Sequence, residues 1–123
     1  MNQTSLLFQE ELYAIPAELE VVLCRSWDSY TPEEKELLGK ILAGIGRTLA
    51  SARIVVRETI DLVDINPSIT SAVLVFGSEA PGINSYEVVQ AQGFSLIRAD
   101  DLPALDTERK KRLWASLRQM FGI

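Results

Sequence analysis

FSLIRADDLPALDTERKKRLWASLRQMF, residues 94–121, is the stretch that says most about the fold, because it indicates a strand, a turn and a helix in succession. Its first residues, 94–97, form a short apolar run that is typical of a buried strand. Asp100 and Asp101 end this run. Pro103 has a fixed φ and no backbone N–H to donate, so the strand cannot continue through it. A new element must therefore begin beyond the proline.

The new element is predicted to be an amphipathic helix that starts at Asp106, whose carboxylate can accept hydrogen bonds from the first free amides. Apolar residues then recur at spacings that gather them on one helical face. That face consists of Leu113, Trp114, Leu117, Met120 and Phe121. The other face carries Arg109, Lys110, Lys111 and Arg112. We expect the apolar face to dock on the rest of the domain.

Upstream, the sequence predicts further strands. Residues 71–76, SAVLVF, are apolar on both faces of an extended chain and belong in the middle of a sheet that is covered on each side. Residues 19–24, LEVVLC, and residues 54–56 are two more strand candidates, and residues 86–90 fit a further short one.

A helix is predicted between the first two strands, because residues 31–34, TPEE, form a capping box with proline at the first helical position. Its glycines allow two interpretations. Either the helix ends near Gly44, or it continues toward Leu49 and the glycines permit close approach to a sheet. Strand, helix and strand in this order predict a parallel unit.

The fold class predicted is α/β: a three-layer α/β/α single domain over residues 12–123, with a small, mainly parallel sheet of about four strands. Residues 1–11 precede it as an N-terminal arm. Leu6, Leu7 and Phe8 in this arm fit either a loose segment or an edge element, and they must dock on this domain or on another protein.

Composition excludes several classes of function. The net charge of −5 opposes direct binding to nucleic-acid phosphates. Cys24 is the single cysteine and lies in an apolar run, so it forms no internal disulfide and indicates a reducing compartment. The sequence has neither a signal-peptide pattern nor an apolar stretch of about 20 residues, the length of a membrane span. We expect a soluble, cytoplasmic protein.

The chain has no histidine, which removes the usual general base and the commonest metal ligand. Asp28, Glu79, Asp100 and Asp101 are carboxylates at predicted strand ends. The last two are adjacent and tend to point apart in extended chain, which makes them poor partners for a shared proton or a metal. We therefore expect no catalytic residue, no metal and no cofactor.

The loop after the strand at residues 71–76 reads GSEAPG, residues 77–82, and resembles the Gly-Glu-Ala-Pro-Gly loop of the uracil-DNA glycosylases that carry iron–sulfur clusters. That resemblance implies an alternative, an inactive nucleic-acid enzyme of this class. Ser78 interrupts the motif, and the chain lacks the histidine and the several cysteines that the family uses. A structural turn explains Glu79 and Pro81 equally well.

Two groups of residues in the domain are candidates for binding a partner. Trp27 and Tyr30 follow the first strand and fit either a buried staple at the helix start or an exposed aromatic anchor. Arg109, Lys110 and Arg112 lie on the basic face of the last helix, which fits either a solvated face or a contact with a partner.

The order and spacing of these elements over residues 12–121 resemble the psi subunit family of the bacterial DNA polymerase III holoenzyme, a small protein attached to the clamp loader. Three features carry the resemblance. They are Ala14-Ile15-Pro16-Ala17 before the first strand, the strand, helix and strand unit, and Leu102-Pro103-Ala104-Leu105 with Leu113-Trp114 in the terminal block.

The resemblance implies a non-catalytic adaptor with a glycosylase-like α/β fold but no active site. Members of the family bind the clamp-loader collar through an N-terminal peptide, and their domain holds the chi subunit, which contacts single-stranded-DNA-binding protein. Here the arm is shorter than that peptide and lacks its tryptophan. Contact with a partner is therefore expected at Leu6, Leu7 and Phe8 or, instead, at Trp27, Tyr30 or the basic helix face.

Overall fold

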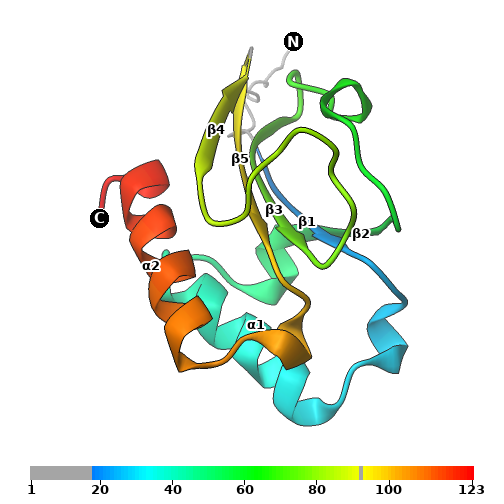
Figure 1. Ribbon diagram of the computed structural model, residues 1–123, viewed down its shortest axis with the longest axis vertical. Coiled ribbons are helices and arrows are strands. Elements are labelled where there is room, and N and C mark those ends of the chain that lie inside the picture. Colours follow the sequence, from blue (N-terminus) through cyan, green and yellow to red (C-terminus); the bar gives the residue numbers. More distant parts are fainter. Residues whose placement is uncertain (1–17, 92) are drawn as a thin grey trace, which may run out of the picture.

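A five-stranded sheet and two α-helices form the fold in the computed structural model, which describes residues 18–91 and 93–123 (Figure 1). The strands are β1 (Glu18–Leu23), β2 (Ala52–Val56), β3 (Thr70–Phe76), β4 (Val88–Ala91) and β5 (Phe94–Ala99). The helices are α1 (Pro32–Gly44) and α2 (Thr107–Phe121). Single 3₁₀ turns are η1 (Trp27–Ser29), η2 (Leu49–Ser51), η3 (Leu62–Asp64) and η4 (Leu102–Ala104). The arm expected over residues 1–11, with Leu6, Leu7 and Phe8, lies outside the described residues.

The strands follow the order β2-β1-β3-β5-β4 across the sheet. Four of them are parallel, and β4 runs antiparallel to β5. Every predicted strand is present, and β1, α1 and β2 form the expected parallel unit. Strand β4 begins at Val88, two residues later than the predicted strand at residues 86–90. Tyr86 adopts a left-handed φ of 63°, which extended chain does not allow. Only two residues, 92 and 93, join β4 to β5, so this pair must be a hairpin.

Helix α1 begins as predicted, because both bonds of the capping box form. Thr31 Oγ1 accepts from the Glu34 amide at 3.2 Å, and the Glu34 carboxylate accepts from the Thr31 amide at 2.9 Å. The helix ends at Gly44, so the shorter of the two alternatives is correct. A Cβ at Gly44 would overlap the Trp114 ring of α2. The glycine therefore permits close approach to a helix, and the expectation of an approach to the sheet is wrong here.

Helix α2 begins after Asp106, whose carboxylate accepts from the Arg109 amide at 2.8 Å, as predicted. Leu113 and Leu117 are buried, while Arg109 to Arg112 are exposed. The amphipathic pattern of the sequence thus orients this helix correctly.

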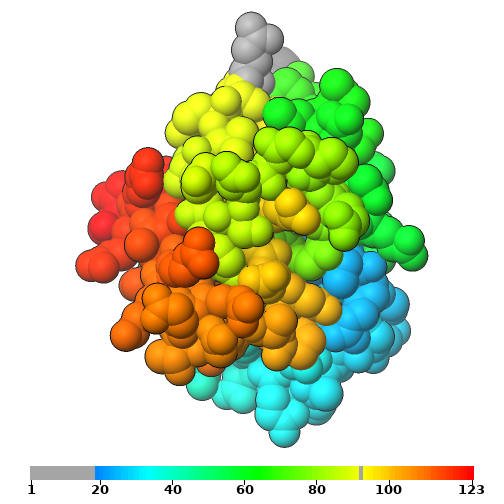
Figure 2. Space-filling model, viewed as in Figure 1, coloured from blue at the N-terminus to red at the C-terminus, as the bar shows by residue number. Residues whose placement is uncertain are grey.

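Both helices cover the same face of the sheet. Leu38 and Leu42 from α1 join Leu113 and Leu117 from α2 in one core cluster with the inward residues of the strands. The opposite face is covered by residues 57–69 and 77–87, which bury Ile60, Ile65 and Ala80 against β1, β3 and β5. Figure 2 shows residues 77–87, in yellow-green, spread over the front of the molecule.

The expected third layer of helix is therefore wrong for the part of the chain that the structure describes. Residues 57–69, which connect β2 to β3, contain one 3₁₀ turn and the Asn66-Pro67 break, and a proline inside the segment prevents a longer helix there. β3 is nonetheless buried on both faces as predicted, since irregular chain covers the face that the helices leave open.

Candidate functional site

The carboxyl ends of β1, β3 and β5 meet at one edge of the sheet, which is where ligands bind in many α/β proteins. This edge brings Cys24, Gly77 and Asp101 together. A Cβ at Gly77 would lie 2.8 Å from the Cys24 sulfur and 2.8 Å from the Asp101 Cβ. Gly77 also has a φ of 83°, which favours glycine. The edge is thus closely packed at its centre.

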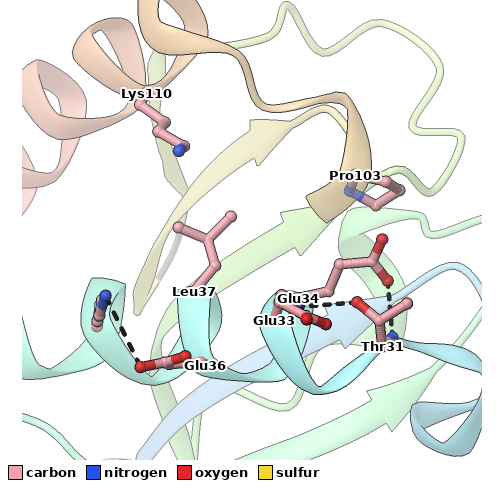
Figure 3. Close-up of a pocket in the computed structure, with 8 residues that line it drawn as sticks. Thr31, Glu33, Glu34, Glu36, Leu37, Pro103 and Lys110 are labelled. Atoms are coloured by element: carbon pink, nitrogen blue, oxygen red, sulfur yellow. Dashed lines mark hydrogen bonds and ion pairs between the residues drawn. The ribbon is translucent and has the colours of Figure 1, made fainter.

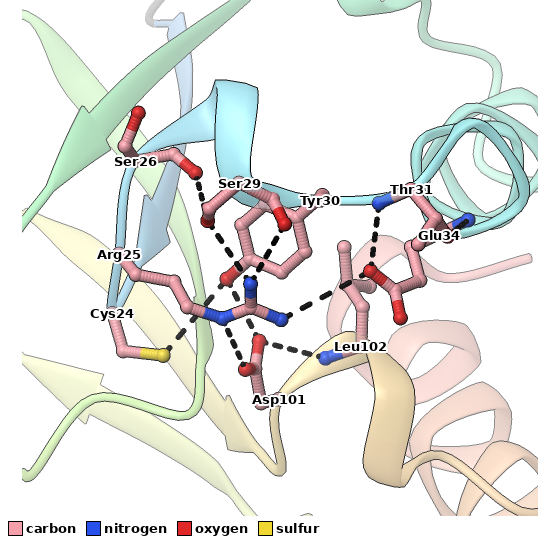
Figure 4. Close-up of polar contacts among 9 residues, drawn as sticks. All are labelled: Cys24, Arg25, Ser26, Ser29, Tyr30, Thr31, Glu34, Asp101 and Leu102. Atoms are coloured by element: carbon pink, nitrogen blue, oxygen red, sulfur yellow. Dashed lines mark hydrogen bonds and ion pairs between the residues drawn. The ribbon is translucent and has the colours of Figure 1, made fainter.

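Asp101 is the centre of a polar cluster at this edge (Figure 4). Its Oδ1 accepts from the Tyr30 hydroxyl at 2.7 Å and from the Leu102 amide at 2.9 Å. Its Oδ2 accepts from Arg25 Nε at 3.1 Å. The Arg25 guanidinium also lies over the Tyr30 ring, 4.0 Å from its centroid. We call Arg25, Tyr30 and Asp101 the Asp101 cluster, and it ties the chain after β1 to the chain after β5.

Tyr30 is buried, so its ring is not an exposed anchor. Burial raises the pKa of the Tyr30 phenol, and the bond to Asp101 raises it further. Burial likewise raises the pKa of the Cys24 thiol, which lies 3.9 Å from the Tyr30 hydroxyl. A neutral thiol is a weak nucleophile, so this edge favours structural bonding over covalent chemistry.

Asp100 faces a different set of partners from those of Asp101. Its Oδ2 accepts from the Tyr86 hydroxyl at 2.6 Å and from Arg109 Nε at 3.0 Å. Burial and this hydrogen bond raise the pKa of Tyr86 to about 12. Arg112 lies over the Tyr86 ring at 4.8 Å. The two neighbouring carboxylates therefore point apart, as expected from their sequence positions.

In the loop at residues 77–82, the polar groups of the first three residues form hydrogen bonds with neighbouring backbone carbonyls. The amides of Gly77 and Glu79 donate to the carbonyls of Ala99 and Glu58 at 2.9 and 2.8 Å. Ser78 is buried, and its hydroxyl donates to the Arg57 carbonyl at 2.6 Å. These amides are therefore not free to bind a phosphate or a base. The Glu79 side chain is 77% exposed and lies 3.9 Å from Arg98.

A cavity of about 340 Å³ opens between the two helices. Leu37, Lys40, Ile41 and Gly44 line it from α1, and Lys110, Leu113, Trp114 and Leu117 line it from α2. Its floor is apolar, and the half-buried Trp114 fills the space that Gly44 leaves. Sequence reasoning missed this cavity. A glycine within α1 and a tryptophan on α2 were the available signals, but neither shows that the two residues meet.

A second cavity, of about 530 Å³, adjoins the first and shares Leu37, Lys40 and Lys110 with it (Figure 3). Its other lining residues are Thr31, Glu33, Glu34, Glu36 and Pro103. The two cavities therefore lie side by side along α1. We call the concave surface lined by both sets of residues the interhelix groove.

The structure separates the predicted partner-binding residues. Trp27 is half-buried, with its ring 6.2 Å from the Tyr30 ring and 5.3 Å from Lys35 Nζ. Arg109 is paired with Asp100, and Arg112 lies over Tyr86, as described above. Lys110 is exposed and lines the interhelix groove. Of these candidates, Lys110 is the one that the fold brings to this concave surface.

Compared with known protein families, curated proteins and solved structures, the chain shows no significant match. Within residues 18–91 and 93–123, no helix combines the length and apolarity needed to cross a membrane. In the same part of the chain, histidine, cysteine and carboxylate side chains form no group of three able to hold a metal ion.

Proposed function

We propose that this chain is a non-catalytic adaptor that binds other proteins, in the role of the psi subunit of a bacterial clamp-loader complex. The observation that carries the proposal is the interhelix groove. It exposes apolar surface from both helices around Trp114, a residue type that is enriched where interfaces concentrate their binding energy. Concave apolar surface of this kind marks a site of interaction.

The carboxyl edge of the sheet supports binding over chemistry. In the Asp101 cluster, the groups that resemble catalytic machinery bond to one another and hold two chain segments together. Cys24 and Tyr30 both have raised pKa values, which keep the thiol and the phenol protonated at neutral pH. Among the described residues at this edge, these side chains are therefore engaged in bonds that stabilise the fold.

The identity of the partners comes from the psi-subunit resemblance. The terminal block that carries it, with Leu113 and Trp114, supplies one wall of the groove. The partners proposed are therefore clamp-loader subunits or a chi-like protein. Direct contact with nucleic acid is not part of the proposal, since the net charge is −5.

The test is affinity purification of the tagged full-length chain from its own cells, followed by quantitative mass spectrometry. We expect clamp-loader or chi-like subunits to be enriched over a tagged control protein. Their reproducible absence would contradict the proposed role.

Two tryptophan variants then locate the contact. Trp114→Ala is expected to reduce recovery of the partner, whereas Trp27→Ala, which alters a half-buried tryptophan outside the groove, is expected to retain it. Thermal melts of both variants show whether each one still folds. Loss of recovery with Trp27→Ala and not with Trp114→Ala would move the interface away from the groove.

A further inference from the structure

The interhelix groove runs along about three turns of α1. Glu33, Leu37, Ile41 and Gly44 on its α1 side recur every three or four residues and so form a single stripe along the helix. With a rise of about 1.5 Å per residue, this stripe is about 17 Å long, which corresponds to about three helical turns. The opposite wall is formed by Pro103 in η4 and by α2.

The charges of the groove change in order along its length. Glu33 and Glu36 lie at the end near the start of α1, and the Glu36 carboxylate is 3.8 Å from Lys40 Nζ, one turn further along the helix. Lys40 and Lys110 line both cavities and so lie in the middle. At the Gly44 end, the charged lining residues among those the structure describes are these same two lysines, and the rest of the lining is apolar. Glu34 is occupied by the capping box.

We infer that the groove binds an amphipathic helix of a partner protein, and this inference rests on the proposed adaptor function. The helix presents an apolar anchor over Gly44 and Trp114, a carboxylate beside Lys110, and a basic residue beside Glu33, while Lys40 and Glu36 form an ion pair with each other. Burial of the anchor supplies most of the affinity, as in other helix-in-groove complexes. The ordered charges fix the direction of the helix and raise the association rate.

The charge order favours this occupant over two others. Nucleic acid would place phosphates beside Glu33 and Glu36, where like charges repel. The arm of this chain, residues 1–11, offers Leu6, Leu7 and Phe8 with two following glutamates, but it contains no lysine or arginine to meet the acidic end. A partner helix with all three features complements the whole groove.

The experiment uses a displayed library of helical 14-residue peptides, selected against the full-length chain. Peptides that bind are expected to combine a large apolar residue, acidic residues and a basic residue in the stated order. A labelled synthetic copy is then titrated by fluorescence anisotropy at low and at high salt.

A matched pair of charge reversals tests the position of the peptide. Lys110 and Lys111 are adjacent and both exposed on α2, but only Lys110 lines the groove among the residues described. Lys110→Glu is expected to weaken binding roughly tenfold, and Lys111→Glu less than about twofold. A peptide whose acidic residues are changed to lysine is expected to bind the Lys110→Glu chain more tightly than the wild-type chain.

Several results would overturn the inference: selected peptides without acidic residues, equal effects of the two reversals, or no recovery of binding on charge exchange. Tighter peptide binding after deletion of residues 1–11 would show that the arm itself occupies the groove, which also overturns it. If clamp-loader subunits are captured by the Lys110→Glu chain as well as by wild type, the adaptor function stands and the groove inference fails. If peptides bind the groove but no clamp-loader subunit is captured, the groove inference stands and the proposed clamp-loader role fails.

Discussion

Asp101→Ala is expected to lower the free energy of unfolding by about 3 kcal/mol, because it leaves two buried donors without an acceptor. The Tyr30 hydroxyl and the Leu102 amide both donate to Asp101 Oδ1, and these residues are 3% and 1% exposed. An unsatisfied buried donor costs about 1–3 kcal/mol. Two such donors together would cost about 2–6 kcal/mol. Water can enter the cavity left by the carboxylate and satisfy them in part, so we expect a value in the lower half of that range.

The ion pair with Arg25 adds little to this magnitude. The Arg25 side chain is 38% exposed, so its guanidinium regains water when the carboxylate is removed. Exposed ion pairs contribute about 0–1 kcal/mol. Asp101→Asn tests this division, because its carbonyl oxygen can still accept from Tyr30 and Leu102 while the charge is lost. We expect Asn to cost about 1 kcal/mol, well below Ala.

Urea denaturation followed by circular dichroism measures these free energies, with Asp28→Ala as the control. Asp28 is an aspartate in the chain after β1, and it is exposed, so its loss is expected to change stability by less than about 0.5 kcal/mol. In thermal melts, Asp101→Ala is expected to lower Tm by about 12 °C, at about 4 °C per kcal/mol for a chain of this size. A loss below about 1 kcal/mol for Asp101→Ala, or an equal loss for Asp28→Ala, would show that Asp101 does not stabilise the fold through these two buried donors.

Three further predictions follow from the same edge of the sheet. Gly77→Ala is expected to cost about 2–3 kcal/mol in urea denaturation, because a Cβ there would lie 2.8 Å from the Cys24 sulfur and the backbone φ is 83°; a neutral effect contradicts this. The pKa of Tyr86 is about 12 against an ordinary 10.0, so the stability that its phenol contributes is complete below pH 10 and is lost as pH rises toward about 12. Absorbance titration of the phenol checks the value, and Tyr86→Phe is expected to reduce the pH dependence of unfolding in that range, with the remainder due to Tyr30, whose pKa is also raised. Incubation with uracil-containing single-stranded DNA is expected to release no free base, whereas release that disappears on Glu79→Gln would establish the glycosylase alternative.

Local interactions explain why much of the fold was predictable. The capping box of α1 joins Thr31 to Glu34, and the N-cap of α2 joins Asp106 to Arg109, so each signal is complete within four consecutive residues. The strands and the buried face of α2 follow from the spacing of apolar residues, which is also local. Lys110, which the fold brings to the groove, was a candidate for the same reason, since helical periodicity placed it opposite the apolar face.

Local patterns in the sequence placed the strands and helices to within a few residues and located the start of each helix, and the composition showed a chain without histidine. Three features emerge only in the folded chain: α1 and α2 share one face of the sheet, Tyr30 bonds to Asp101, and Gly44 meets Trp114. Each of these contacts joins residues that are distant in the chain, so no local pattern encodes it. Periodicity specifies which side of a helix is apolar but not which apolar surface covers it, and that choice follows from packing of the complete chain.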